Sequence, residues 1–298
     1  MGQKSKLMIF KEKSSEAIGI GLAIAFIVDV VLFVWAFWGN NSMTLASPRL
    51  SFLNIGQGDS SLIELPGGVQ ILIDGGPDGK RLLENLEQIL PPQDRRIDLL
   101  IMTHPQLDHF AGFIDVLKKY EVGAFLSSGR KVEIPAYKEL ISQLKKRDVP
   151  YIQIVEGDSI GVGQTKLRIV GPSSSELVSG ELNDSSVVVL LESPEVKALY
   201  TGDIGFAVEK RLVEDYNLDV DVLKVGHHGS RFSSSEQFLA ETTPELSAII
   251  VGKNTYGHPT ASALERLEKY SQKITRSDKD GIIQVIGKAD ALQVFNFK

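Results

Sequence analysis

Three side chains that can bind a metal ion lie within six residues, in the segment His104-Pro105-Gln106-Leu107-Asp108-His109. Two of the chain's five histidines are here, and two more stand side by side at His227-His228. A divalent ion needs several such donors that converge at about 2.0–2.2 Å. Because the chain has no cysteine, thiolate ligands are excluded. The clustering predicts a metal site built from histidine, carboxylate, amide or backbone groups.

Two further segments place polar side chains directly after apolar ones. Asp203 ends the segment Tyr200-Thr201-Gly202-Asp203. An aspartate at this position can complete or bridge a metal site, and it can equally cap the helix that follows. His227 and His228 follow an apolar run, and adjacent side chains point in different directions. One of them can therefore bind a metal while the other contacts substrate or supports a ligand.

Three weaker candidates complete the set. Asp74 precedes Gly75-Gly76. Its carboxylate could orient a metal-binding histidine, or it could be an ordinary turn residue. Asn183 could bring an amide to the site, although it also fits a turn. His258, in Tyr256-Gly257-His258-Pro259, is a candidate substrate contact or a turn histidine.

The elements that must position these residues alternate between strands and helices from residue 50 onward. Apolar runs bounded by turn residues predict strands over 50–55, 60–65, 69–74, 97–102, 122–126, 151–155, 167–170, 187–192, 196–201, 220–225, 248–252, 282–286 and 292–297. Helical spacing predicts helices over 80–90, 108–120, 136–146, 206–213, 235–242 and 262–270. This α/β (α+β) order fits two mixed sheets with helices outside them, and the candidate ligands fall at strand ends.

The N-terminal region predicts a membrane anchor. Residues 17–38 are almost all apolar, with Asp29 as their single charge, which is long enough to cross the ~30 Å hydrocarbon core as a helix. Four lysines precede this run, at positions 4, 6, 11 and 13, whereas the residues just after it carry only Arg49. The charge asymmetry puts a cytoplasmic segment at 1–16, a linker at 39–49 and a domain over 50–298 on the extracytoplasmic side. A cleaved signal peptide and a buried core helix are the alternatives.

Composition adds one exclusion. The net charge of −6 and the pI near 5.5 give no sign of a strongly basic chain, the usual mark of a protein that coats nucleic acid. Composition therefore gives a DNA substrate no support of its own.

The motifs, taken in order, resemble those of the metallo-β-lactamase superfamily, and within it the extracellular hydrolase domain of ComEC-type DNA-internalisation (competence) proteins. The motifs that carry the resemblance are Gly56-Gln57-Gly58-Asp59, Leu72-Ile73-Asp74-Gly75-Gly76, His104 to His109, Asn183-Asp184-Ser185-Ser186, Thr201-Gly202-Asp203, Leu223-Lys224-Val225-Gly226-His227-His228-Gly229-Ser230 and Tyr256-Gly257-His258-Pro259. The resemblance implies an αββα sandwich and hydrolysis by a metal-activated water. It covers residues 50–298.

Position by position, the resemblance also implies a set of roles. His104 would bind a first metal, with Asp203 touching both sites. Asp108, His109 and His228 would bind a second metal, either Zn²⁺, the first choice, or Mn²⁺. Asp108 or Asp203 would accept a proton, and His227 or His258 would stabilise developing charge.

The chain departs from the superfamily pattern at two positions. Gln106 and Asn183 stand where the superfamily has histidines. The sequence therefore predicts one tightly bound ion, with a second that is weak or absent.

The leading functional hypothesis is hydrolysis of phosphodiester bonds in DNA or a related polymer outside the membrane, alongside DNA-uptake partners. Two alternatives stay open. One is hydrolysis of another envelope phosphoester or ester, because one fold hosts many chemistries. The other is a metal-poor, non-catalytic binding module.

Overall fold

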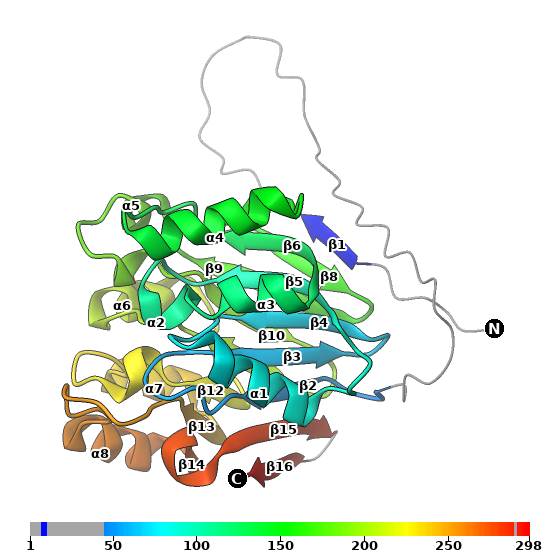
Figure 1. The fold of residues 1–298 in the computed structure, drawn as a ribbon. Helices are drawn as coiled ribbons and strands as arrows, with labels where there is room; N and C mark the ends of the chain where they lie inside the picture. The colour runs from blue at the N-terminus through cyan, green and yellow to red at the C-terminus, as the bar shows by residue number, and fades with distance from the viewer. Residues whose placement is uncertain (1–6, 11–44, 289–290) are drawn as a thin grey trace, which may run out of the picture.

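Two eight-stranded sheets, packed face to face with helices outside them, make up the part of the chain that the structure describes (Figure 1). The structure, a computed structural model, describes residues 7–10, 45–288 and 291–298. One sheet runs in the order β16 (Ala291–Phe297), β15 (Ile282–Lys288), β2 (Arg49–Phe52), β3 (Ser61–Leu65), β4 (Val69–Ile73), β5 (Arg96–Met102), β6 (Glu121–Ser127), β7 (Tyr151–Gln153). The other runs β1 (Leu7–Phe10), β8 (Ser159–Val162), β9 (Thr165–Gly171), β10 (Val188–Glu192), β11 (Lys197–Tyr200), β12 (Val222–Lys224), β13 (Leu246–Ile249), β14 (Lys273–Arg276).

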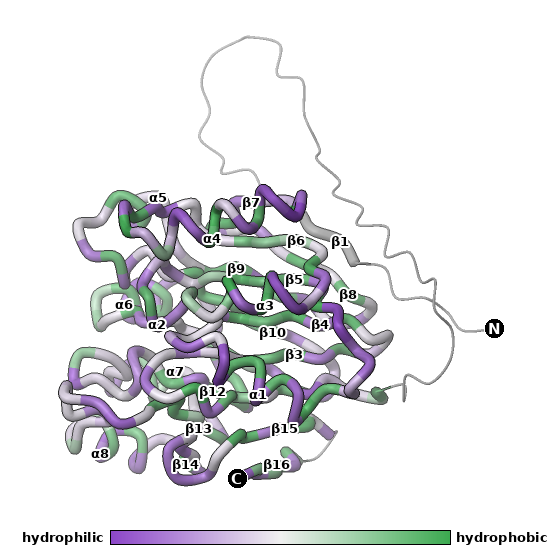
Figure 2. The backbone as a smooth tube through the Cα atoms, in the orientation of Figure 1, coloured by the Kyte–Doolittle hydropathy of each residue, from purple (hydrophilic) through white to green (hydrophobic). Residues whose placement is uncertain are grey.

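The core between the sheets follows from strand alternation. In β10, Val189 and Leu191 point into the space between the sheets, whereas Val188 and Leu190 point outward to the helices. The middle of β5 is apolar on both faces, as expected for a strand that is covered on both sides. Figure 2 shows green, hydrophobic stretches along these central strands. The sandwich is therefore built from four layers.

The helices form the two outer layers. They are α1 (Gly79–Ile89), α2 (Leu107–Phe110), α3 (Phe113–Lys119), α4 (Pro135–Lys146), α5 (Ser174–Leu177), α6 (Phe206–Asp215), α7 (Glu236–Thr242), α8 (Ala261–Tyr270) and α9 (Ser277–Asp280), with 3₁₀ turns η1 (Asn183–Ser185) and η2 (Gly226–Gly229). Helices α1, α3 and α4 cover the sheet that contains β5 (Figure 1). Helices α6, α7 and α8 bury apolar residues against the outer face of the other sheet. The predicted αββα sandwich is confirmed.

The helix expected over 108–120 is instead two helices, α2 and α3, with a break at 111–112. Gly112 packs against the backbone of Gly75, so closely that a side chain at position 112 would collide with the Gly75 carbonyl oxygen. The Gly112 N–H donates to the Gly76 carbonyl oxygen (3.0 Å). This contact ties the metal-binding segment to the turn after β4. Three strands, β1, β8 and β14, lie where the sequence predicted none.

The predicted membrane span at 17–38 lies outside the described residues. Within the described ranges, no helix is both long and apolar enough to cross a membrane. Strand β1, however, lies ahead of that span and pairs antiparallel with β8, with Leu7 opposite Val162 and Phe10 opposite Ser159. This pairing places residues 7–10 on the same body as the sandwich.

Candidate metal centre

All the predicted ligands gather at one edge of the sandwich, where four strands end. Strands β4 and β5 are parallel neighbours in one sheet, and β11 and β12 are parallel neighbours in the other. Their carboxyl ends lead directly into Asp74, His104, Asp203 and His227. Because loops at the carboxyl ends of parallel strands meet at the same edge, residues more than a hundred positions apart are brought together.

Three buried histidines each point their Nε2 atom into this cluster. The Nε2 atoms of His104, His109 and His228 have no hydrogen-bond partner within the described parts of the chain, and neither has Oδ1 of Asp203. The exposed fraction of each of the three histidines is 2% or less. Buried polar atoms without partners are costly, so four of them in one place indicate a missing cation.

His109 is held by a carboxylate behind it. Its Nδ1 lies 2.8 Å from Oδ2 of Asp74, and its Nε2 lies 3.3 Å from Oδ2 of Asp203. Asp74 also accepts hydrogen bonds from the backbone N–H and the hydroxyl of Thr103, both at 2.8 Å. These bonds fix Asp74, and Asp74 fixes the ring of His109 with Nε2 facing the cluster. This contact matches the sequence-based expectation for Asp74.

His227 and His228 point in different directions, as the sequence suggested. Both have left-handed backbone conformations, with φ of 48° and 53°, and their rings are inclined at 77°. Nε2 of His228 lies 3.6 Å from carboxylate oxygens of Asp108 and of Asp203, inside the cluster. His227 is a third exposed, and its Nε2 lies 3.8 Å from Asp203. The geometry favours His228 as the ligand and leaves His227 at the mouth.

The donors form overlapping groups rather than two separate sites. His104, His109 and Asp203 make one group, and Asp108, His109 and His228 make another, each with ligand atoms within 4.8 Å of one another. His109 belongs to both groups. The five predicted metal ligands are thus brought together, and the donor set of imidazoles and carboxylates fits a divalent ion such as Zn²⁺ or Mn²⁺.

Burial and charge set the protonation of the cluster. Burial, together with the charge of His109, lowers the pKa of His104 to about 3. The pKa of His228 is raised to about 10, because the charges of Asp203 and Asp59 outweigh its burial. The pKa of His109 is likewise raised well above its usual value, because Asp203 and Asp74 outweigh burial. Without a metal, protons on His109 and His228 balance the carboxylates.

The pKa values of the two carboxylates nearest those rings fall. Burial would raise the pKa of Asp108, yet the nearby ring of His228 and the charge of His109 lower it to about 2. Burial likewise opposes the change at Asp203, but the charges of His109 and His228 hold its pKa well below the usual range. Both side chains are therefore ionised at neutral pH and are available to a cation.

Sequence reasoning missed Asp59. Its Oδ1 lies 3.3 Å from Nδ1 of His228, and its Oδ2 accepts a hydrogen bond from the Lys224 ammonium in a pair that is almost fully buried. The same His228 nitrogen lies 3.0 Å from the carbonyl oxygen of Ile250. Asp59 thus lies beside the ring of His228 and adds negative charge there, while the Ile250 carbonyl oxygen holds Nδ1 of that ring; Oδ1 of Asp59 has no hydrogen-bond partner within the described residues. Asp59 and Lys224 both lie in motifs that carry the family resemblance, but the sequence does not show that the two residues meet.

The remaining candidates lie beside the cluster. The Gln106 side-chain amide donates to Oδ1 of Asn183, and Nδ2 of Asn183 lies 3.4 Å from Nδ1 of His227. The ring of His258 lies 5.4 Å from that of His227, farther from the cluster.

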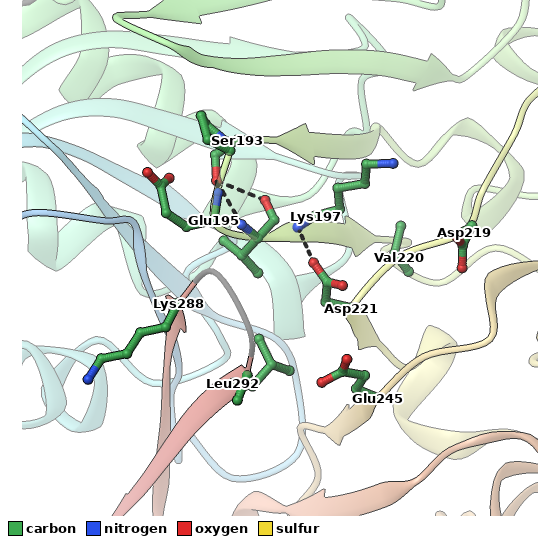
Figure 3. Close-up of a pocket in the computed structure, with 12 residues that line it drawn as sticks. Ser193, Glu195, Lys197, Asp219, Val220, Asp221, Glu245, Lys288 and Leu292 are labelled. Atoms are coloured by element: carbon green, nitrogen blue, oxygen red, sulfur yellow. Dashed lines mark hydrogen bonds between the residues drawn. The ribbon is translucent and has the colours of Figure 1, made fainter.

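A pocket elsewhere in the molecule is a poor alternative. It lies at the opposite edge of the sandwich, where β11, β12 and β13 begin (Figure 3). Its lining includes Glu195, Asp219, Asp221 and Glu245, and Asp221 accepts a hydrogen bond from the Lys197 backbone N–H. The two lysines of the lining, Lys197 and Lys288, do not balance these four carboxylates. The pocket therefore disfavours an anionic substrate, and the chemistry is expected at the metal cluster.

Comparison with known families agrees with the fold and the site. Residues 53–253 match the family described as the metallo-beta-lactamase superfamily. The chain belongs to this superfamily, and it is a metal-dependent hydrolase by family. All five candidate ligands lie within the matched range.

Its curated relatives are competence proteins and a recombination protein. ComE operon protein 3 of Bacillus subtilis (strain 168) is 26% identical over 296 residues, covering 93% of this chain and 37% of that protein. Recombination protein 2 of Haemophilus influenzae is 28% identical over 83% of this chain and 30% of that protein. Competence protein ComA of Neisseria gonorrhoeae is 31% identical over 68% of this chain and 28% of that protein. The chain therefore spans about a third of the length of these relatives.

Solved structures agree on the fold. Igni18, a metallo hydrolase from the archaeon Ignicoccus hospitalis, superposes with a TM-score of 0.52 at 16% identity, covering 84% of this chain and 100% of that chain. The metallo-beta-lactamase fold protein YhfI of Bacillus subtilis gives 0.54 at 10% identity, with the same coverages. At such low identity, the likeness establishes the fold alone.

Proposed function

We propose that this chain hydrolyses phosphodiester bonds, with DNA as its substrate. The observation that carries the proposal is the convergence of three unpartnered, buried Nε2 atoms with Asp203 at the edge of a metallo-β-lactamase sandwich. The competence proteins among its relatives supply the choice of DNA. The ring of His227, a third exposed at the mouth, suits contact with an anionic group.

The residues divide into ligands and supporting groups. Asp108, His109 and His228 would hold the tighter ion, His104 would serve a weaker one, and Asp203 would touch both. When bound, a divalent ion lowers the pKa of water toward neutrality and offsets phosphoryl charge. Asp74 and the Ile250 carbonyl oxygen keep the rings of His109 and His228 aimed at the cluster, and Asp59 adds a negative charge beside His228.

The chain's own groups would manage protons and charge. Asp108 is about a third exposed, and so a carboxylate can accept a proton at the mouth of the site. Asp203 is fully buried and can do so only from within the cluster. His227 and His258 face the open side, where they would donate hydrogen bonds to the phosphoryl oxygens or to the leaving group.

The test is cleavage by the purified full chain loaded with Mn²⁺ or Zn²⁺. The substrates are labelled DNA and bis-p-nitrophenyl phosphate, and Asp108→Ala is compared with Glu268→Ala, an exposed carboxylate on α8. We expect the native chain and Glu268→Ala to cleave alike and Asp108→Ala to lose at least 100-fold in kcat/KM. Absence of cleavage of both substrates by the metal-loaded native chain would remove the proposal.

A second candidate function rests on the pairing of Gln106 with Asn183. If these amides leave the centre too poor in donors to hold a metal, the chain is a binding module in a DNA-uptake assembly. Metal content after purification, measured alongside the Asp108→Ala comparison, separates the two: a module holds no ion and its Asp108→Ala variant matches the native chain.

The anchored topology belongs to the same proposal. Residues 17–38 would cross the cell membrane once, with the hydrolase domain on the extracytoplasmic side beside the partners that deliver DNA. The apolar length of this segment and the lysines before it support the topology. The pairing of β1 with β8 does not, since a single crossing would separate these strands.

A further inference from the structure

A row of three aromatic rings leads from the metal cluster to the surface. Nε2 of His227 lies 3.8 Å from Asp203. The ring of His258 lies 5.4 Å from that of His227, nearly perpendicular to it at 81°. The ring of Tyr256 lies 5.8 Å from that of His258, inclined by only 32°. The row therefore ends in two rings whose faces are roughly aligned.

The outer end of the row is open but held in place. Tyr256 is 71% exposed, a high value for a large aromatic side chain. The Asn254 side chain fixes the loop that carries it: its amide donates to the carbonyl oxygens of Gly252 (2.9 Å) and His258 (2.8 Å), and its Oδ1 accepts the His258 N–H (3.0 Å). A ring on such a braced loop loses little freedom when something stacks on it.

Positive charge accompanies the row. Arg231, three residues after His228 in the chain, is exposed. Phe232, the next residue, is 66% exposed. An exposed cation beside exposed aromatic rings is the combination that binds the backbone and bases of a single strand.

We propose that Tyr256 and His258 form a stacking platform for a nucleobase next to the scissile phosphate, so that the site takes single-stranded nucleic acid. The proposal rests on the proposed phosphodiesterase function and names its substrate class. In a duplex the bases already stack on one another, so their faces are not available to a protein ring. A single strand has free base faces, and every base has one, so the platform carries little sequence preference.

The decisive comparison uses two substrates of different size on the metal-loaded full chain. A single-stranded deoxyoligonucleotide can reach the platform, whereas bis-p-nitrophenyl phosphate needs only the cluster. We expect Tyr256→Ala to raise KM for the oligonucleotide by about 5- to 150-fold, the range for losing one stacked base, with little change for the small diester. Tyr256→Phe keeps a ring face and should stay within about threefold of the native chain for both.

Controls separate stacking from general damage. Phe295→Ala removes an exposed aromatic side chain from β16, away from the cluster, and should leave both KM values unchanged. An oligonucleotide whose nucleotides next to the cleaved bond lack bases should bind the native chain as weakly as the intact oligonucleotide binds Tyr256→Ala. Equal losses on the small diester, no effect of Tyr256→Ala, or an equal effect on duplex DNA would overturn the proposal.

Binding measurements keep this proposal apart from the proposed function. If the native chain cleaves nothing, fluorescence anisotropy with the same oligonucleotide still gives a Kd. If the Kd rises at least fivefold in Tyr256→Ala and not in Tyr256→Phe, the stacking platform is supported even though the protein does not hydrolyse the oligonucleotide. A Kd that is the same in all variants overturns it, as does tighter binding of an acidic envelope polymer through the same residue.

Discussion

The side-chain amide of Gln106 donates a hydrogen bond to Oδ1 of Asn183, joining the segment before α2 to η1 across the mouth of the metal cluster. The superfamily pattern has histidines at both positions. The two amides thus satisfy each other rather than facing a cation, while Nδ2 of Asn183 lies beside His227. The half of the centre near His104 is left with fewer strong donors than the half near His228.

We therefore expect the native chain to bind one divalent ion tightly and a second at least 10-fold more weakly. Restoring imidazoles with Gln106→His and Asn183→His together should bring the second ion to within 10-fold of the first, because imidazole is a far better ligand than a neutral amide. Titration calorimetry and elemental analysis measure both values. Two equally tight ions in the native chain would contradict this.

Metal binding should strengthen as pH rises. The pKa of His228 is raised to about 10, chiefly by Asp203 and Asp59 against the opposing effect of burial, and the pKa of His109 is also raised. Both rings carry a proton in the metal-free chain at pH 7, and a metal binds only the neutral ring. Two released protons correspond to an increase in apparent affinity of up to about 100-fold per pH unit between pH 6 and 8.

Calorimetry in buffers with different protonation enthalpies counts those protons. His228→Ala should release one fewer. His104→Ala provides the control: because burial already lowers the pKa of His104 to about 3, its loss should weaken binding while leaving the number of released protons unchanged. An affinity independent of pH would show that the rings are neutral before the metal arrives.

Strand periodicity and motif order predict most of the fold, because both depend on local sequence. Helix 108–120 shows the limit: its apolar spacing is helical throughout, and the break at Gly112 comes from the Gly75 backbone, which the local pattern does not reveal. Strand β8 was missed for a similar reason. It has only four residues, one of them a glycine, and its place in the sheet depends on pairing with β9.

The metal-binding side chains of the site could be predicted, because they lie in recognisable motifs. Asp59 lies in a glycine-rich motif that reads as a turn, and nothing local says that it faces His228 and Lys224. Ser186, whose hydroxyl lies 3.3 Å from Nδ1 of His104, is hidden in the same way. Such supporting contacts join segments far apart in sequence, so a single sequence does not reveal them.

Asp59 should affect both stability and metal affinity. Asp59→Asn leaves the Lys224 ammonium buried without a carboxylate, which should lower the free energy of unfolding by about 3–5 kcal/mol. The double variant Asp59→Asn/Lys224→Met removes both charges and should recover most of that loss. Its metal affinity should nevertheless stay about 10- to 100-fold below that of the native chain, because His228 still lacks its carboxylate.

Urea unfolding and metal titration of the three proteins test these values. Lys224→Met alone is the matched control, because it leaves the Asp59 carboxylate, rather than the Lys224 ammonium, buried without its charged partner. If the double variant bound metal as tightly as the native chain, Asp59 would serve only as the counter-ion of Lys224, and its role beside His228 would be excluded.

The pairing of β1 with β8 and a single membrane crossing by residues 17–38 exclude each other, because a crossing puts residues 7–10 and the sandwich on opposite sides. The chain has no cysteine, so each introduced one is a unique label. For the anchored topology, a membrane-impermeant maleimide on intact cells should label Lys145→Cys, exposed on α4, and leave Met8→Cys unlabelled. The pair Met8→Cys/Gly161→Cys, whose Cα atoms are partners in the sheet, should then form no disulfide in the membrane. Efficient cross-linking there would establish the β1–β8 pairing in the cell and rule out the crossing.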